Sequence, residues 1–220
     1  MSSKAWKAFT ASTDDVKRLL EIHASLGGDA PGRRYRLEVL NMSAIVLITA
    51  IWEAYCEDLA AEALNHLVSN VSRAADLPEA LRKTIAADIK KETHELAMWD
   101  LAEDGWKTRV TNRLASLTAE RNRKLNTPKA SNIDNLFSSA IGIDDVSSAW
   151  KWTRMSPQKA RDKLDKYVEL RGAIAHRGSA GSSVKRTQVE DYYSHVREIA
   201  SKTGGCVNRF VKSIVRRALW

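Results

Sequence analysis

Residues 34–70 carry a long helical pattern whose middle is apolar on every side, and this pattern constrains the fold more than any other feature. It contains the longest apolar run of the chain, AIVLITAIW at 44–52. That run is about half of the ~20 residues that a helix needs to cross a bilayer. A helix that is apolar all round belongs at the centre of a bundle. We therefore predict a buried core helix and no membrane anchor.

Helical periodicity extends over almost all of the remaining chain, and no convincing pair of strands is evident. The first helix is expected to open at STDD, residues 12–15, and to run to about Leu26. Pro78 suits the first turn of another helix, whose pattern covers 79–122 with a weak point at Gly105.

Residues 122–134 form the clearest non-helical connection. Residue pairs typical of helix starts follow at Ser131 with Asp134, Ser156 with Pro157, and Thr187 with Glu190. The helix that opens at Ser156 should end near Gly178, and the last helix should run towards Trp220 with a potential break at Gly204 and Gly205.

These elements predict an all-α helical bundle of about 6–8 helices. We expect one domain over residues 1–220, with its core at about 35–180 and a basic helical segment at 184–220. A chain of this length is long enough to bury a substantial core.

The net charge of +8 is unevenly distributed. Residues 1–100 hold 12 Lys and Arg against 15 Asp and Glu, whereas residues 101–220 hold 23 against 12. This asymmetry favours an anionic partner, most commonly nucleic acid, about as well as it fits solubilising charge. Cys56 and Cys206 lack metal-like spacing, and the N-terminus lacks a signal peptide. We therefore expect a soluble cytoplasmic protein without a metal site.

The stretch YVELRGAIAHRG at 167–178 places two phosphate-binding side chains around four small or apolar residues. Arg171 lies on the apolar stripe of the expected helix, where a guanidinium is costly unless it snorkels or pairs with an acid. His176 follows about 140° around an ideal helix. Two such helices packed about a two-fold axis would bring both pairs into one cleft, and small residues such as Gly172 would permit the close approach.

Arginine, four intervening residues and histidine at the end of a bundle helix resemble the signature of HEPN ribonucleases. Two further stretches, WEAYCEDLAAEAL at 52–64 and LNTPKASNIDNLF at 125–137, resemble the RiboL-PSP-type HEPN subgroup in the same order along the chain. The resemblance covers roughly residues 35–180.

The resemblance implies a homodimer that cleaves RNA without a metal ion or other cofactor. The ribose 2′-OH would attack the adjacent phosphorus and leave a 2′,3′-cyclic phosphate and a 5′-OH end. His176 would exchange protons near neutrality, and Arg171 would offer its planar donor fork to the phosphoryl oxygens. The substrate would be tRNA, mRNA or rRNA, in a toxin, antiviral-defence or stress context with an antitoxin or operon partner.

Glu53 stands in the otherwise apolar helix and would orient Arg171, or would simply face solvent at the polar edge of the helix. Arg177, Lys185 and Arg186 flank the motif and would hold the RNA backbone, although each also fits an ordinary solvated charge.

Other interpretations of the sequence stay open. Gly172 stands where many active members carry a polar residue, which favours the alternative of a non-catalytic HEPN module for RNA binding or dimerisation. A helical adaptor without nucleic acid would leave the basic C-terminal half unexplained. Trp150 and Trp152 could stack on bases beside the basic linker, although core packing is the commoner role. The other histidines are expected to be structural or exposed.

Overall fold

The computed structural model describes residues 2–27, 37–113, 127–177 and 183–220. Regular structure in these residues is helical, and their one β-type contact is an isolated bridge between Trp152 and Met155. The all-α fold class is therefore confirmed.

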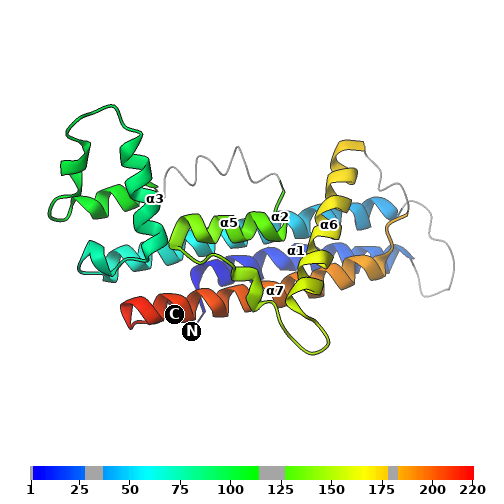
Figure 1. Ribbon diagram of the computed structural model, residues 1–220. Coiled ribbons are helices and arrows are strands. Elements are labelled where there is room, and N and C mark those ends of the chain that lie inside the picture. Colours follow the sequence, from blue (N-terminus) through cyan, green and yellow to red (C-terminus); the bar gives the residue numbers. More distant parts are fainter. Residues whose placement is uncertain (1, 28–36, 114–126, 178–182) are drawn as a thin grey trace.

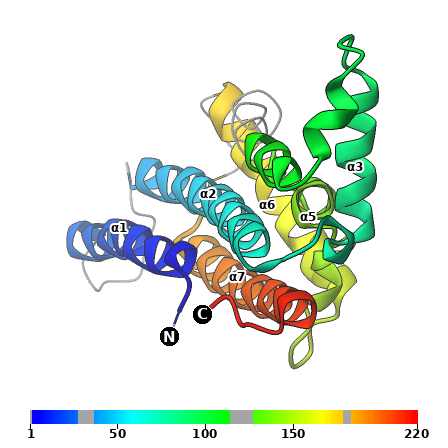
Figure 2. The same cartoon turned by 90° about the vertical axis from the view of Figure 1, so that its left-hand side faces the viewer.

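The long helices are α1 (Lys4–Gly27), α2 (Glu38–Asn70), α3 (Glu79–Lys90), α5 (Ala130–Ile141), α6 (Pro157–Arg177) and α7 (Arg186–Val215) (Figure 1). Short 3-10 turns are η1 (Ala74–Asp76), η2 (Ala97–Leu101) and η3 (Val146–Ala149), and residues 105–113 are also helical. Helices α1, α2 and α7 lie side by side in both views, whereas α6 crosses them steeply (Figures 1 and 2). Helix α3 and residues 97–113 form a lobe at one end (Figure 1).

Helix α2 is the centre of the bundle, as its all-round apolar pattern predicts. It packs against α1, α5, α6 and α7. Its buried side chains therefore cover more than half of its circumference and include Ile45, Ile48, Trp52, Tyr55, Cys56 and Leu59. Ser43, Ala50, Ala54 and Asp58 form a narrower exposed face. By length and composition alone α2 could cross a membrane, but half of the qualifying window is buried inside the structure. That burial matches a core helix, which can meet the same criteria of length and composition.

An aromatic cluster joins α2 to its neighbours. The rings of Phe9 and Tyr55 lie 5.1 Å apart, and Trp52 meets Trp150 edge-on at 5.8 Å. The Tyr55 hydroxyl donates to the carbonyl of Ala200 at 2.9 Å. Aromatic pairs at these spacings add about 0.5–1.5 kcal/mol each beyond simple burial. The cluster thus fixes α1, α7 and the η3 segment on α2.

Helix α1 begins eight residues before the predicted start at 12–15. Ser3 Oγ accepts the N–H of Trp6 at 2.9 Å, and the Glu62 carboxylate of α2 accepts the N–H groups of Lys4 and Ala5 at 3.1 and 3.0 Å. A tertiary carboxylate therefore caps the helix. The hydroxyl of Thr13, expected as a cap, instead donates within the helix to the carbonyl of Thr10.

The helical pattern over 79–122 is interrupted more widely than Gly105 alone predicts. Helix α3 ends at Lys90, and residues 91–104 contain only the turn η2 before helix resumes at Gly105. Pro78 is the N-cap of α3, one residue outside the first turn. The end of the pattern at 114–122 lies outside the described residues.

The start of α6 is confirmed, because Ser156 Oγ accepts the N–H of Lys159 at 3.3 Å. The capping pair proposed at Ser131 is wrong. Helix α5 already begins at Ala130, and Asp134 is used in a tertiary contact described below.

The capping pair of Thr187 with Glu190 is also wrong. Helix α7 begins at Arg186, so its N-cap is Lys185 and not Thr187. The Gln188 side chain accepts the N–H of Lys185 at 2.8 Å. Glu190 instead accepts from Arg186 at 2.8 Å.

Helix α7 continues without a break through Gly204 and Gly205, contrary to the sequence prediction. A Cβ at Gly204 would lie 2.7 Å from the Tyr55 hydroxyl, which is too close for real atoms. A Cβ at Gly205 would meet only the Arg209 guanidinium, at 3.4 Å. Gly204 therefore serves helix packing rather than helix termination.

Gly204→Ala should lower the free energy of unfolding by about 1–3 kcal/mol, because the buried Tyr55 cannot move aside cheaply. Gly205→Ala is the matched control in the same helix. It should be neutral or stabilising by up to about 1 kcal/mol, since alanine favours helix. Urea unfolding followed by circular dichroism checks both. Equal effects of the two substitutions would contradict the packing role of Gly204.

Candidate active site

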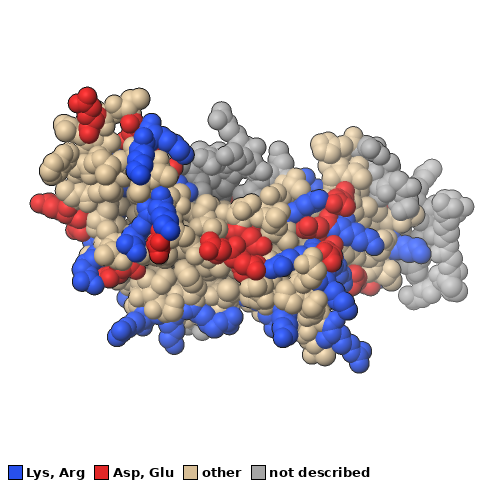
Figure 3. All heavy atoms as spheres, viewed as in Figure 1, with Lys and Arg blue, Asp and Glu red and all other residues tan. Residues whose placement is uncertain are grey.

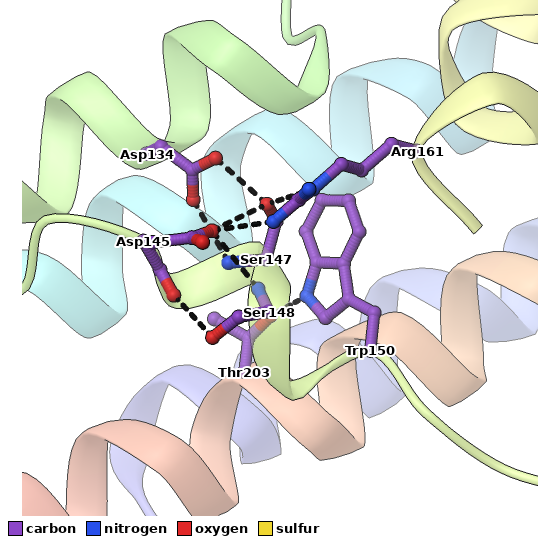
Figure 4. Close-up of polar contacts among 7 residues, drawn as sticks. All are labelled: Asp134, Asp145, Ser147, Ser148, Trp150, Arg161 and Thr203. Atoms are coloured by element: carbon purple, nitrogen blue, oxygen red, sulfur yellow. Dashed lines mark hydrogen bonds and ion pairs between the residues drawn. The ribbon is translucent and has the colours of Figure 1, made fainter. Parts of the chain in front are cut away.

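A polar network fixes the base of α6, the helix that carries Arg171 and His176 (Figure 4). Asp134 of α5 accepts from both the backbone N–H and the hydroxyl of Ser147, at 2.8 and 2.7 Å. Arg161 of α6 donates to the Ser147 hydroxyl at 2.6 Å and to Asp145 at 2.5 Å. Burial raises the pKa of Asp134, although the Ser147 hydrogen bonds oppose that shift. The network therefore ties η3 to α5 and α6.

The next turns of α6 are held by α7. The rings of Tyr167 and Tyr192 stack with centroids 4.2 Å apart. Asp191 accepts from the Tyr167 hydroxyl at 2.9 Å and from Lys163 at 2.6 Å. Leu164 is fully buried on the same side. This contact fixes the rotation of α6 one turn before the motif.

Arg171 is half-buried, as its place on the apolar stripe predicts. Burial raises the pKa of Glu53 to about 7 with help from Glu57, and the charge of Arg171 opposes the shift. Arg171 also opposes the rise in pKa that burial causes in Tyr192. The guanidinium therefore lies in the electrostatic neighbourhood of α2 and α7. Of the two interpretations of Glu53, the structure favours a partly buried acid beside Arg171.

Tyr192 was not among the candidates from sequence. It is fully buried, stacks on Tyr167, and its hydroxyl lies 3.0 Å from Thr49 Oγ1. The only sequence signal for it is its place on the apolar stripe of the last helix, which gives no hint of the neighbouring Arg171.

His176 lies in the last turn of α6 and is exposed, as is Ala175 before it. The helix projects at this end beyond the rest of the bundle (Figure 1). Among the atoms that the structure describes, none outside the local helix lies within 4 Å of a Cβ built on Gly172. One side of the motif thus packs on the bundle, while a side lined by small residues is open. That is the asymmetry that a helix needs to pack closely on a second copy of itself.

The expected RNA-binding residues fall into different environments. Lys185 is exposed at the start of α7, and Arg186 is tied to Glu190 in a half-exposed ion pair. Arg177 ends α6, and its side chain lies outside the described residues. A half-exposed pair of this kind contributes little to stability.

The tryptophan expected beside the linker is a core residue. Trp150 is fully buried and donates to Thr203 of α7 at 2.9 Å, so base stacking by this ring is excluded in the folded chain. Trp152 is half-buried with its ring 5.7 Å from His195. Burial lowers the pKa of His195 to about 4, as expected for a structural histidine. In the described part of the chain, no three His, Cys, Asp or Glu residues are grouped as a metal site requires.

The model of the RiboL-PSP-HEPN family matches residues 11–209. The chain belongs to this family. The match extends beyond the resemblance over 35–180 to include most of α1 and α7. No curated protein and no solved structure matches significantly. The HEPN family is related to ribonucleases and RNA-binding modules, which is the class of activity that its members share.

Glu53→Gln should change how stability depends on pH. The pKa of Glu53 rises from 4.5 to about 7 on folding. Protonation of its carboxyl therefore stabilises the folded state fully below pH 4.5, and this stabilisation is lost as pH rises through 7. The variant should therefore exceed wild type in Tm at pH 8 by about 2–4 °C, allowing for solvent screening, and should lose this advantage at pH 5. Thermal unfolding at both pH values measures the difference. The same difference in Tm between variant and wild type at pH 5 and pH 8 would contradict a pKa of Glu53 raised by burial.

Proposed function

We propose that this HEPN chain is a metal-independent endoribonuclease with a composite site at a homodimer interface. The observation that carries the proposal is the placement of Arg171. Its side chain is half-buried on α6, and its charge acts on Glu53 of α2 and on Tyr192 of α7, while His176 is exposed in the last turn of the same helix. Membership of the RiboL-PSP-HEPN family supports RNA as the substrate class.

In the proposed reaction the ribose 2′-oxygen forms a bond to the adjacent phosphorus and the bond from phosphorus to the 5′-oxygen breaks. A His176 imidazole accepts the 2′-OH proton, and the leaving 5′-oxygen takes up a proton from an imidazolium or water. Arg171 offers its guanidinium to the phosphoryl oxygens and stabilises the charge that builds on them. Glu53 acts as a positioning residue, because its carboxylate attracts the guanidinium that must face the phosphate.

The open, small-residue side of α6 supports the dimer. Arg171 and His176 are separated by about 140° around one helix, so one chain does not aim both side chains at one point. A second α6 related by a two-fold axis would place each histidine opposite the other chain's arginine. The absence of any described atom near a Cβ at Gly172 leaves room for that helix.

We place this activity in the cytoplasm, in a toxin, antiviral-defence or stress context. A free ribonuclease would damage the RNA of its own cell, so an antitoxin or operon partner that restrains it is part of the proposal. Gly172 in place of a polar residue favours one alternative, an HEPN module that binds RNA or dimerises without cutting.

His176→Ala and Arg171→Ala should each abolish cleavage of total RNA and tRNA in EDTA. We expect losses of about 10²–10⁴-fold, the range for removing a general acid–base group or an oxyanion donor. Analysis of the ends should find cyclic phosphates from wild type only. His94→Ala and Arg73→Ala are controls that remove the same residue types from exposed positions outside α6.

Cleavage that persists in both motif variants would sink the catalytic assignment. Binding of RNA that weakens with salt, without cleavage by the wild-type dimer, would establish the non-catalytic alternative.

Gly172→Leu tests dimer formation independently of the stability of the single chain. A Cβ at position 172 has no described atom within 4 Å, and leucine favours helix by nearly 1 kcal/mol over glycine, so Tm should not fall. It should nevertheless block the approach of a second α6 and abolish both dimer formation and cleavage. Sedimentation velocity and the RNA assay test this, with Gly172→Ala as the small-residue control. A dimeric, active leucine variant would contradict the composite site.

A further inference from the structure

The C-terminal half of α7 carries a row of basic side chains that is separate from the motif. Lys202, Arg209, Lys212 and Arg216 are spaced by 7, 10 and 14 residues from the first. At 100° per residue the first three fall within a sector about 80° wide of α7, and Arg216, the C-cap residue directly after the helix, extends the row to about 21 Å. We call these four residues the basic stripe.

The basic stripe is not neutralised by neighbouring acids. Several other cations of the bundle are paired, as Lys163 is with Asp191 and Arg161 with Asp145. Within the described ranges, no Asp or Glu forms an ion pair with any residue of the stripe. Unpaired charge in a row that a helix holds straight is an arrangement suited to a polyanion.

A tight turn beside α7 adds another arginine. The backbones of Trp152 and Met155 exchange two hydrogen bonds, of 3.2 and 3.0 Å, and Arg154 stands exposed at the tip. The contacts of Trp150 with Thr203 and of Trp152 with His195 hold this segment against α7. Figure 3 shows Lys and Arg gathered along the lower edge of the molecule, over α7 and this turn.

Two arginines of this surface have left-handed backbones. Among described residues other than glycine, positive φ occurs at Glu103, Arg154 and Arg216, with values of 51°, 64° and 54°. This conformation costs an L-residue roughly 1–2 kcal/mol, and glycine or asparagine usually takes such positions. Arginine at both sites of the basic surface is therefore unfavourable for the backbone, which points to a use for its side chain.

We propose that the basic stripe and Arg154 form a second RNA-binding surface, which holds the phosphate backbone of a long or folded RNA. Over about 21 Å one strand of a duplex presents about six phosphates, and arginine forks bind them in pairs of hydrogen bonds. This inference rests on the proposed function, which names RNA as the substrate class. The projecting end of α6 and the basic stripe lie at opposite edges of the chain (Figure 1). A folded RNA of tRNA size reaches beyond the motif, whereas a short oligonucleotide occupies the motif alone.

The test uses the full chain with His176→Ala, so that binding is measured without cutting. Arg154→Gly with Arg216→Gly should weaken tRNA binding about tenfold and reduce the slope of log K against log salt by about 1.4–1.8, as loss of two phosphate contacts predicts for single-stranded and duplex segments. Tm should stay equal or rise, because glycine relieves both backbones. Binding of a short single-stranded oligoribonucleotide should not change.

Lys83→Gln with Lys90→Gln is the matched control, because it removes the same charge from exposed positions on α3. It should change tRNA affinity less than twofold. Lys202→Gln, Arg209→Gln and Lys212→Gln together test the helix itself with residues of similar helix propensity, and should weaken tRNA binding further.

Unchanged tRNA affinity in both stripe variants would overturn the inference. The inference would also fall if the stripe variants bound RNA like the parent chain but lost its binding to phosphatidylserine vesicles, since the surface would then face a membrane. The proposed nuclease is judged separately by wild-type cleavage. Stripe-dependent tRNA binding by a chain that never cuts would uphold the surface and reject the enzyme.

Discussion

The structure depends on covering α2. This helix of 33 residues buries side chains over more than half of its circumference, so no single neighbour could cover it. Helices α1, α5, α6 and α7 surround it, and each arrives from a different part of the chain. The burial of aromatic and aliphatic side chains along α2 is worth about 1.5–3 kcal/mol for each, which makes it the main source of stability. Every other helix is positioned relative to this one.

The candidate site takes its electrostatics from the same burial. Glu53 is half-buried on α2, and removal of its carboxyl from water raises its pKa to about 7. A carboxylate in that environment interacts more strongly with a nearby guanidinium than one in water would. The polar network at Ser147 and the stacked pair of Tyr167 with Tyr192 hold α6 at two earlier points. Arg171 is thus placed by a fixed helix, while His176 stands on its unsupported end.

Periodicity in the sequence predicts most of this fold because each helix face is defined by residues a few positions apart. It locates the central helix, the Ser156 start of α6 and the burial of Arg171. It fails at α1 in part because Glu62, a residue 58 positions away from Lys4, accepts the first N–H groups of the helix beside the local cap Ser3. It fails at Gly204 because the need for glycine comes from Tyr55 on another helix. Local signals carry no information about such tertiary partners, and Asp134 is misassigned for the same reason.

The site residues show the same division. The spacing of Arg171 and His176 identifies the motif, and the apolar context of Glu53 marks it as an acid that needs a partner. Sequence leaves open whether Glu53 faces solvent, and only the packing of α6 on α2 places its carboxyl near the guanidinium. The environment of Tyr192 and the core position of Trp150 likewise depend on which helices meet.

The two sides of α6 meet opposite requirements, and this bears on control of the proposed enzyme. The inner side is fixed by aromatic stacking and ion pairs, so the orientation of the motif is settled within one chain. The outer side carries Gly172, whose Cβ position meets no described atom, and Ala173 and Ala175 lie close to it in the helix. A reaction that needs both helices then requires association before chemistry, and its rate falls with the square of monomer concentration when dimers are scarce. Under the proposed dimeric mechanism, a partner that covers only the open side of α6 would silence the enzyme without disturbing its fold.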